Sequence, residues 1–238
     1  MERLDKLIAH LGHISRAEAH RLIRAGLVAV DGAPCRDIAA KWDPTAVTLA
    51  LRGEVLRYQR HRYLALNKPA GVLSAARDEK APTVLDLLSP AQRSRTLAPV
   101  GRLDKDTVGL LLLTDDGDFA HRLLSPRRHV PKRYCARLSE PLPSDTAARF
   151  AEGITLADDT HCLPATLVVH TAREVELTIF EGKYHQVRRM FAAAGSHVEW
   201  LQRTAIGALE LDALRLAEGH ARDLTAAELA LLTSADFG

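Results

Sequence analysis

The first fifty residues carry the spacing of two short amphipathic helices followed by a strand. Apolar side chains recur at helical intervals between Leu4 and Leu11. Ser15 and Glu18 form a capping box that predicts the start of a second helix, and Gly26 stands where that helix is expected to end. The sequence LVAVDG then predicts a strand closed by an Asp-Gly turn. Residues 1–59 are therefore predicted to form a small helical-hairpin module and its linker.

After residue 60 the apolar positions follow a period of two or form short unbroken runs, which indicates strands. We expect helices between some of them, each starting at a capping residue or ending at glycine or proline. Strands are predicted at residues 63–68, 109–114, 132–138, 165–170, 174–182 and 197–211, and helices at residues 83–88, 118–124, 146–153, 184–195 and from Thr225 onward. Strands outnumber helices and do not alternate with them regularly. Residues 60–238 are therefore predicted to form an α+β domain with a mixed, mainly antiparallel sheet.

Composition indicates an ordinary globular protein but does not identify its function. Of the 238 residues, 47% are hydrophobic and 26% are charged, as in ordinary soluble proteins. No apolar run is long enough to span a membrane, and the charged N-terminus is not that of a signal peptide, so we expect neither. Three scattered cysteines favour reduced thiols in a cytoplasm over a disulfide framework. A cytoplasmic monomer is expected.

The distribution of positive charge is more informative than the formal net charge of +2. Residues 121–134 contain five basic side chains and no acid, whereas a solvated surface normally mixes both signs. A second basic cluster lies at residues 183–189. The first cluster favours phosphate binding over a merely solvated face, and the second leaves the two interpretations balanced.

Several common chemistries lack their sequence signal. The chain has no GxGxxG, no GxxxxGK[ST] and no GxSxG, which argues against dinucleotide, P-loop and hydrolase sites. It has no HExxH and no cysteine-rich cluster, and His121 and His129 lie among cations that would repel a metal ion. We therefore expect no metal site.

One loop places acidic and basic residues directly before the apolar run at 109–114. Asp104 in this loop can act as a nucleophile only while it is ionised, and burial alone would raise the pKa of the carboxyl group. An arginine partner would hold the charge. Arg102 is too near in sequence to be the automatic partner, because alternate residues of an extended loop need not face each other. Arg188 or Arg189 fills this role if the fold brings the later helix to the loop.

Four motifs in this order resemble the RsuA-type family of ribosomal RNA pseudouridine synthases. They are RYLALNKPAGVLS, GRLDKDTVGLLLLTDDGD, KRYCARL and EGKYHQVRRMFAAAGSHV. The earlier segment SRAEAHRLIRAGLVAVDG resembles the S4 RNA-binding module that such enzymes carry. The resemblance covers almost the whole chain. It implies an N-terminal S4-like domain and a pseudouridine synthase domain that needs no cofactor.

The resemblance also implies roles for single residues. Asp104 matches the catalytic aspartate, and Tyr134 matches the tyrosine that stacks on the uracil ring. Arg188 matches the basic residue that pairs with the aspartate, and Arg102 would contact the RNA or help to displace the base. Asp106 is interpreted as an ordinary loop carboxylate. Residues expected to contact RNA are Arg16, Arg21, Arg24, Arg102, Arg127, Arg128, Lys132, Lys183 and Arg189.

The expected reaction breaks the C1′–N1 bond of a uridine, turns the uracil and rejoins it through C5. The target base must first be flipped out of the RNA. Details of the sequence resemble the small-subunit branch, which implies 16S ribosomal RNA, or a small-subunit assembly intermediate, as partner and uridine 516 as target. Two alternatives stay open: the same chemistry on a 23S uridine, and a non-catalytic RNA-binding factor in ribosome assembly.

Overall fold

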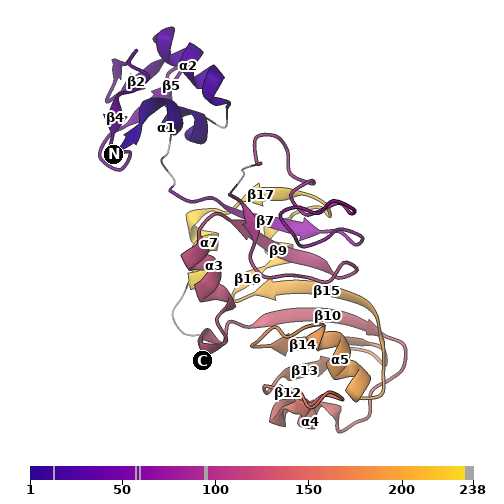
Figure 1. Ribbon diagram of the computed structural model, residues 1–238. Helices are drawn as coiled ribbons and strands as arrows, with labels where there is room; N and C mark the ends of the chain where they lie inside the picture. Colours follow the sequence, from indigo (N-terminus) through magenta and orange to yellow (C-terminus); the bar gives the residue numbers. More distant parts are fainter. Residues whose placement is uncertain (13, 57, 59, 94–95, 234–238) are drawn as a thin grey trace. The chain divides into compact units, whose positions relative to one another are not determined.

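The computed structural model describes residues 1–233 except 13, 57, 59, 94 and 95. The chain divides into two compact units (Figure 1). The first comprises Met1–His61 and the short segment Ser89–Gln92, and the second comprises the remaining described residues from Arg62 onward. Each unit has a hydrophobic core of its own. No helix in the described part of the chain has the length and hydropathy needed to cross a membrane.

The first unit packs two helices against small antiparallel sheets. Its elements are β1 (Glu2–Arg3), α1 (Leu4–Leu11), α2 (Arg16–Arg24), β2 (Val28–Val30), β3 (Ala33–Pro34), β4 (Lys41–Trp42), β5 (Leu49–Leu51) and β6 (Glu54–Leu56). The larger sheet has the order β3-β2-β5-β6, and β1 pairs with β4. The Ser15 hydroxyl caps α2 by accepting from the Glu18 amide, as the capping box predicts. Asp31 and Gly32 both have positive φ, as the two-residue turn of an Asp-Gly hairpin requires.

The second unit is built on one mixed sheet with the order β13-β14-β10-β15-β9-β7-β17. Its described strands are β7 (Tyr63–Lys68), β8 (Ala98–Pro99), β9 (Val108–Thr114), β10 (Lys132–Leu138), β13 (Thr166–Val169), β14 (Glu174–Ile179), β15 (Val198–Ile206), β16 (Leu209–Glu210) and β17 (Ala221–Asp223), with β11 (Ile154–Thr155) and β12 (His161–Cys162) as a separate pair. All the pairings described within this sheet are antiparallel apart from β9 with β15. The mainly antiparallel α+β fold is thus confirmed.

Helices cover both faces of this sheet, and each face has its own core. The helices are α3 (Gly117–Leu124), η1 (Pro126–Arg128), α4 (Thr146–Glu152), α5 (Gln186–Ala193), α6 (Leu211–Leu214) and α7 (Ala226–Thr233). Side chains of α4 and α5 pack on one face, and side chains of α3, α6 and α7 pack on the other. Alternate leucines of β9 enter the two cores, so this strand is buried throughout.

At β9 the parallel pairing depends on one glycine. Gly109 has a φ of 101°, and a Cβ atom there would overlap the carbonyl oxygen of Arg203 on β15. Because this conformation favours glycine and the approach leaves no room for a side chain, Gly109 lets the two strands lie together. The Asp104 loop directly precedes this contact.

Three local predictions are wrong. Residues 83–88 form turns rather than a helix: Thr83 makes a β-bridge to Leu73, and the Asp86 and Leu88 amides donate to the Thr83 and Leu85 carbonyls at 3.0 and 3.3 Å. Helix α5 begins at Gln186 and not at residue 184, because His185 adopts a left-handed conformation. Residues 197–211 form a hairpin of β15 and β16 instead of one strand, since the chain turns at residues 207–208.

Candidate active site

The carboxylate of Asp104 lies in the loop between β8 and β9, opposite the beginning of α5. Arg188 places its Nε 3.7 Å from Oδ2, and His185 places its Nε2 3.4 Å from Oδ1. The first distance is that of an ion pair rather than a hydrogen bond. The Arg188 Nη1 also donates to the Val198 carbonyl at 3.0 Å, which fixes the guanidinium between α5 and β15. Of the arginines considered from the sequence, Arg188 is therefore the one that forms an ion pair with Asp104.

The Asp104 loop is held from beneath by a fully buried lysine. Lys68 ends β7, and its Nζ donates to the carbonyls of Pro69, Lys105 and Thr107 at 2.9, 3.0 and 2.9 Å. An ammonium group has three donors, so these bonds use all of them. Burial lowers the pKa of Lys68 to about 8, and the charges of Asp106 and Asp104 oppose that decrease. Lys68 thus fixes the backbone on the C-terminal side of Asp104.

A second set of bonds fixes the N-terminal side of the same loop. The Ser74 hydroxyl donates to the Leu103 carbonyl at 2.8 Å, and the Leu103 amide donates back to Ser74 at 3.0 Å. The Gly71 amide donates to the Lys105 carbonyl at 2.9 Å. Because both residues adjoining Asp104 are anchored, the position of its carboxylate is set by backbone that cannot shift freely.

Asp104 opens onto a cavity of about 110 Å³ beneath the loop. Tyr134 of β10 is buried and lines this cavity, in keeping with its predicted place beside the uracil ring. Residues including Asp104, Lys132 and His185 also line a wider groove of about 740 Å³. A small cavity within a larger groove suits one flipped nucleotide of a longer nucleic acid.

Two cations and a hydroxyl group line the cavity from buried positions. Lys132 and Arg203 are 8% and 4% exposed, and Thr107 is 1% exposed. Burial, followed by the charge of Arg203, lowers the pKa of Lys132 to about 8, and Glu181 acts in the opposite direction. Lys132, which was expected to contact RNA, lies at the start of β10 as the predicted strand at 132–138 implies, but its side chain is buried at the cavity.

The segment before α5 is ordered by hydrogen bonds that present His185 to Asp104. The Gln186 side chain donates to Glu181, which is buried, and accepts from the Lys183 amide. Lys183 is also paired with Glu181 at 2.7 Å, so part of its predicted availability for RNA is taken up within the protein. The Tyr184 ring stacks on His185 with centroids 3.9 Å apart and is itself 71% exposed at the groove.

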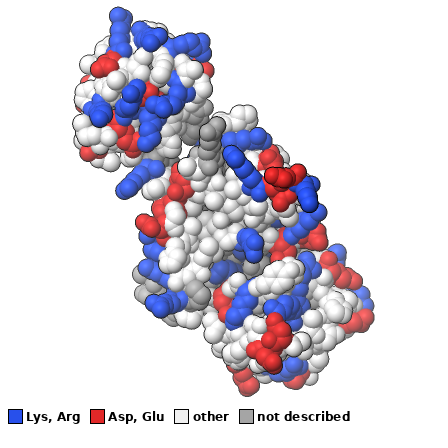
Figure 2. All heavy atoms as spheres, in the orientation of Figure 1, with Lys and Arg blue, Asp and Glu red and all other residues white. Residues whose placement is uncertain are grey.

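The other residues of the second unit that were predicted to contact RNA do not lie together. Arg102 is exposed and lines the cavity. Arg127 and Arg128 are exposed on η1. Arg189 is directed away from Asp104 and pairs with Asp158. On the face drawn in Figure 2, basic side chains gather over the first unit and are interspersed with acidic ones over the second.

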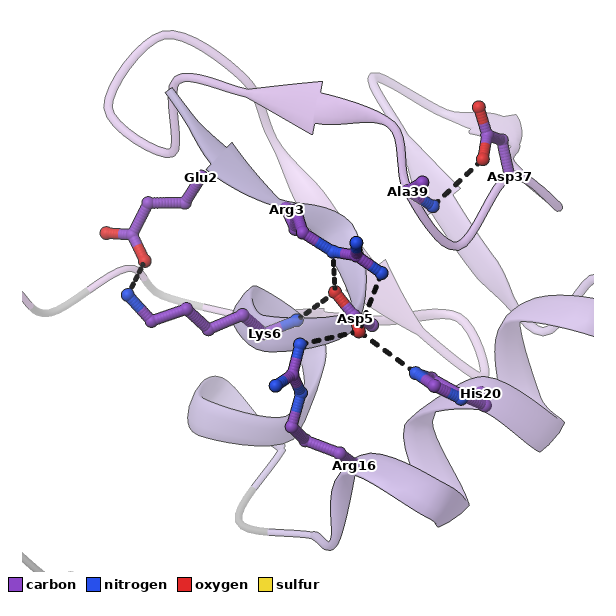
Figure 3. A network of polar contacts seen from close by, with 8 residues as sticks. All are labelled: Glu2, Arg3, Asp5, Lys6, Arg16, His20, Asp37 and Ala39. Atoms are coloured by element: carbon purple, nitrogen blue, oxygen red, sulfur yellow. Dashed lines mark hydrogen bonds and ion pairs between the residues drawn. The ribbon is translucent and has the colours of Figure 1, made fainter.

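In the first unit the buried Asp5 carboxylate organises several cations (Figure 3). Its oxygens lie 3.0 Å from the Arg3 Nε, 2.8 Å from the Arg16 Nη2 and 2.9 Å from the His20 Nε2. Burial raises the pKa of Asp5, but the hydrogen bonds from these three side chains outweigh it and hold that pKa well below its usual range. Arg16 is therefore positioned at the surface by an internal anion.

The remaining cations predicted for this unit are exposed. Arg21 lies 3.5 Å from Glu18, and Arg24 is exposed at the end of α2. Both lie on the helix that Ser15 caps. They are accessible to a ligand on the surface of the first unit.

Sequence reasoning missed Lys68, His185, Thr107 and Arg203 as parts of the site. A signal existed for Lys68, which occupies an alternate position with Leu64 and Leu66 in the predicted strand, so a buried lysine was indicated. No local pattern marks Thr107 or Arg203, because they meet only through the pairing of β9 with β15.

Comparisons with known proteins agree with this geometry. The family described as RNA pseudouridylate synthase matches residues 62–193, and the S4 domain family matches residues 2–44. "Ribosomal small subunit pseudouridine synthase A" of Escherichia coli (strain K12) is 46% identical over 96% of this chain and 98% of the relative. "Uncharacterized RNA pseudouridine synthase YtzG" of Bacillus subtilis (strain 168) is 43% identical over 97% and 98%.

A solved structure supports the same assignment. The "Crystal structure of pseudouridylate synthase" matches with a TM-score of 0.67 and 37% identity, over 98% of this chain and all of the other. The matched family covers the loop, strands and helix that carry Asp104, Tyr134 and Arg188. The chain belongs to the RNA pseudouridylate synthase family and carries an N-terminal S4 domain.

Proposed function

We propose that this protein converts one uridine of 16S ribosomal RNA to pseudouridine, at position 516, with Asp104 as the catalytic residue. The observation that carries the proposal is the Asp104 carboxylate at the mouth of a nucleobase-sized cavity, with Arg188 3.7 Å away. An ionised carboxylate at this position is the group that the reaction requires at the ribose of a flipped nucleotide.

The reaction moves bonds within one nucleotide and consumes no other reactant. In one route Asp104 attacks C1′ as the C1′–N1 bond breaks, and C5 of the turned uracil later displaces the carboxylate. In the other route Asp104 removes the C2′ proton, so that the uracil leaves and a glycal forms; C5 then adds to C1′ as Asp104 returns the proton to C2′. In both routes the C5 proton is lost at the end. Arg188 supports either route by pairing with the carboxylate and orienting it.

The site is suited to holding a base that has been flipped out of RNA. Tyr134 offers an aromatic face inside the cavity and replaces stacking that the base loses on leaving the helix. Arg102 at the cavity and Arg127 and Arg128 on η1 are exposed and would hold phosphates. In the S4 domain Arg16, Arg21 and Arg24 would contribute further contacts to structured RNA.

The choice of 16S ribosomal RNA rests on relatives. Full-length relatives at 46% identity are named as small-subunit pseudouridine synthases, which favours 16S over 23S RNA. The position within 16S RNA rests on the sequence resemblance alone. A deletion strain therefore has to be mapped across both RNAs.

The test is reverse-transcription mapping of carbodiimide-treated ribosomal RNA from cells that lack this gene. The strain is complemented with wild type, with Asp104→Asn, or with Asp106→Asn as a matched control in the same loop, where Asp106 is exposed. We expect one 16S stop to vanish in the deletion strain and to return with wild type and Asp106→Asn only. A lost stop in 23S RNA would overturn the substrate, and no lost stop would favour a non-catalytic RNA-binding factor.

A further inference from the structure

Two cations occupy buried positions in the cavity, on one face of the central sheet. Arg203 of β15 is the cross-strand partner of Tyr134 on β10, and Lys132 lies two residues before Tyr134 on the same strand. Because alternate residues of a strand share a face, all three side chains point to the side of the sheet where the cavity lies. Lys132 and Arg203 are close enough for the charge of one to affect the pKa of the other.

The hydrogen bonding of these groups is incomplete. Arg203 donates from Nε to the Leu110 carbonyl at 2.8 Å, but its buried Nη2 has no partner among the described residues. The buried hydroxyl of Thr107, which lines the same cavity, also has none in the described chain. For the ammonium of Lys132, the described residues supply one acceptor, the Val130 carbonyl at 2.9 Å. Buried polar groups are normally satisfied, so these atoms point to a ligand that completes them.

The charge balance of the cavity defines the chemistry of that ligand. Glu181, the acidic group that acts on Lys132, is already engaged by Lys183 and by Gln186. Asp104 in the same cavity is matched by Arg188. Among the residues that the structure describes, Lys132 and Arg203 therefore have no anion of their own, and buried cations without one are costly. The missing ligand offers oxygen acceptors and carries negative charge at some stage of the reaction.

We propose that Lys132 and Arg203 stabilise the uracil anion that is released from C1′, by donating hydrogen bonds to its O2 and O4 oxygens. This inference rests on the proposed function, because it concerns the nucleobase that Asp104 releases. The Thr107 hydroxyl accepts from N3–H, the one polar hydrogen that uracil retains. Lys132 and Arg203 then act as catalytic residues, because they touch the reacting base.

The electron balance of the reaction requires such a group in both routes. When the C1′–N1 bond breaks, its electron pair stays with N1 and is delocalised onto O2 and O4. The ribose carbon is compensated either by the bond from Asp104 or by the C1′–C2′ double bond. Donors directed at the oxygens where charge develops lower the barrier to this step, as in an oxyanion hole. The inference thus does not depend on which route Asp104 follows.

The same two cations would bind a phosphate if the nucleotide backbone entered the cavity. That alternative predicts a loss of RNA affinity when either cation is removed, with no dependence on how easily the base leaves. Stabilisation of a leaving group predicts the opposite: a slower bond-breaking step at unchanged affinity. A nucleobase that is more acidic, and so leaves more easily, therefore separates the two alternatives.

The experiment measures single-turnover consumption of the target nucleotide in 16S RNA made with uridine or with 5-fluorouridine. The fluorine atom stabilises the anion of the released base and so supplies part of the stabilisation that the two cations otherwise provide. We expect Lys132→Met and Arg203→Met each to slow the uridine reaction about 100-fold relative to wild type on the same RNA. With 5-fluorouridine the decrease should be about 10-fold or less. RNA affinity in a filter-binding assay should be unchanged.

Matched variants separate this role from folding. Arg137→Met removes a cation from the exposed side of β10 and should leave the rate unchanged. Lys132→Arg keeps the charge and should recover most of the lost rate. If thermal unfolding shows that a Met variant is not folded, Lys132→Gln and Arg203→Gln take its place.

Equal decreases on both RNAs, a loss of affinity alone, or unchanged rates would each overturn the inference. Failure of the proposed function gives a different result. In that case wild type itself consumes no uridine of 16S RNA, and the comparison with 5-fluorouridine does not arise.

Discussion

Lys68→Met tests whether a buried ammonium group holds the Asp104 loop in place. Methionine has a similar length and no donor, so the substitution removes all three hydrogen bonds to the carbonyls of Pro69, Lys105 and Thr107. The side chain is fully buried, so water cannot readily take its place. The loop would lose its support on the C-terminal side of Asp104.

The expected change in stability is the difference between two opposing effects. The Lys105 carbonyl keeps the Gly71 amide as a donor, whereas the Pro69 and Thr107 carbonyls lose the Lys68 donor at a cost of about 1–3 kcal/mol each. Against this, methionine avoids the cost of burying the ammonium group, which is about 3 kcal/mol for a pKa lowered from 10.5 to about 8. With about 4 kcal/mol lost at the two carbonyls and about 3 kcal/mol regained, we expect Lys68→Met to lower the free energy of unfolding by about 1 kcal/mol. A displacement of Asp104 by about 1 Å would also slow turnover about 100-fold.

Urea denaturation of the full chain and single-turnover kinetics measure these two quantities. Lys80→Met is the control, since Lys80 is exposed. The pH dependence adds a sharper test. Above pH 8 the unfolded state holds the Lys68 proton more tightly than the folded state does, so wild-type stability rises with pH up to about 10.5. The variant lacks this rise, so its deficit should widen over that range. A variant with wild-type stability and rate, or a deficit that stays constant from pH 8 to 10, would refute the reasoning.

Three further substitutions probe other parts of the structure. Gly109→Ala should cost more than 3 kcal/mol or prevent folding, because a methyl group would overlap the Arg203 carbonyl; circular dichroism and expression yield check this. Asp5→Asn should destabilise the S4 domain by about 2 kcal/mol at neutral pH, followed by Trp42 fluorescence in urea. That difference should shrink as the pH falls below about 4, since the lowered pKa gives stability that is lost on protonation. The wild-type rate should decrease as the pH rises through about 8 while Lys132→Arg shows no such decrease, because the lysine loses its charge and arginine does not.

Most elements were predictable because their signals are local. The capping box at Ser15, the period of two in β7 and the apolar run of β9 are each contained in a few neighbouring residues. The turn at residues 83–88 was mistaken for a helix because Asp86 bonds back to Thr83 as a helix cap would, whereas the β-bridge from Thr83 to Leu73 has no local signal in the sequence. Helix α5 likewise begins later than predicted because His185 adopts a left-handed conformation, which depends on its contacts in the folded protein.

The site was predictable to the extent that motifs carry it. Asp104 and Arg188 match a known motif, and the structure places them together. Arg203 and Thr107 were not found, because a buried arginine in a strand looks like any other polar position until its neighbours are known. Burial, pairing across strands and missing partners are properties of the assembled sheet.

The pairing of β9 with β15 also determines the stage of synthesis at which the candidate site can first assemble. Asp104 emerges from the ribosome long before residues 185–203, which supply His185, Arg188 and Arg203. Contacts between segments this far apart in sequence form slowly and only after the later segment is available. A growing chain that ends before β15 therefore carries the aspartate loop without the strand beside it. The central sheet ties the assembly of the candidate site to chains that extend through β15, so we expect chains that stop earlier not to modify RNA.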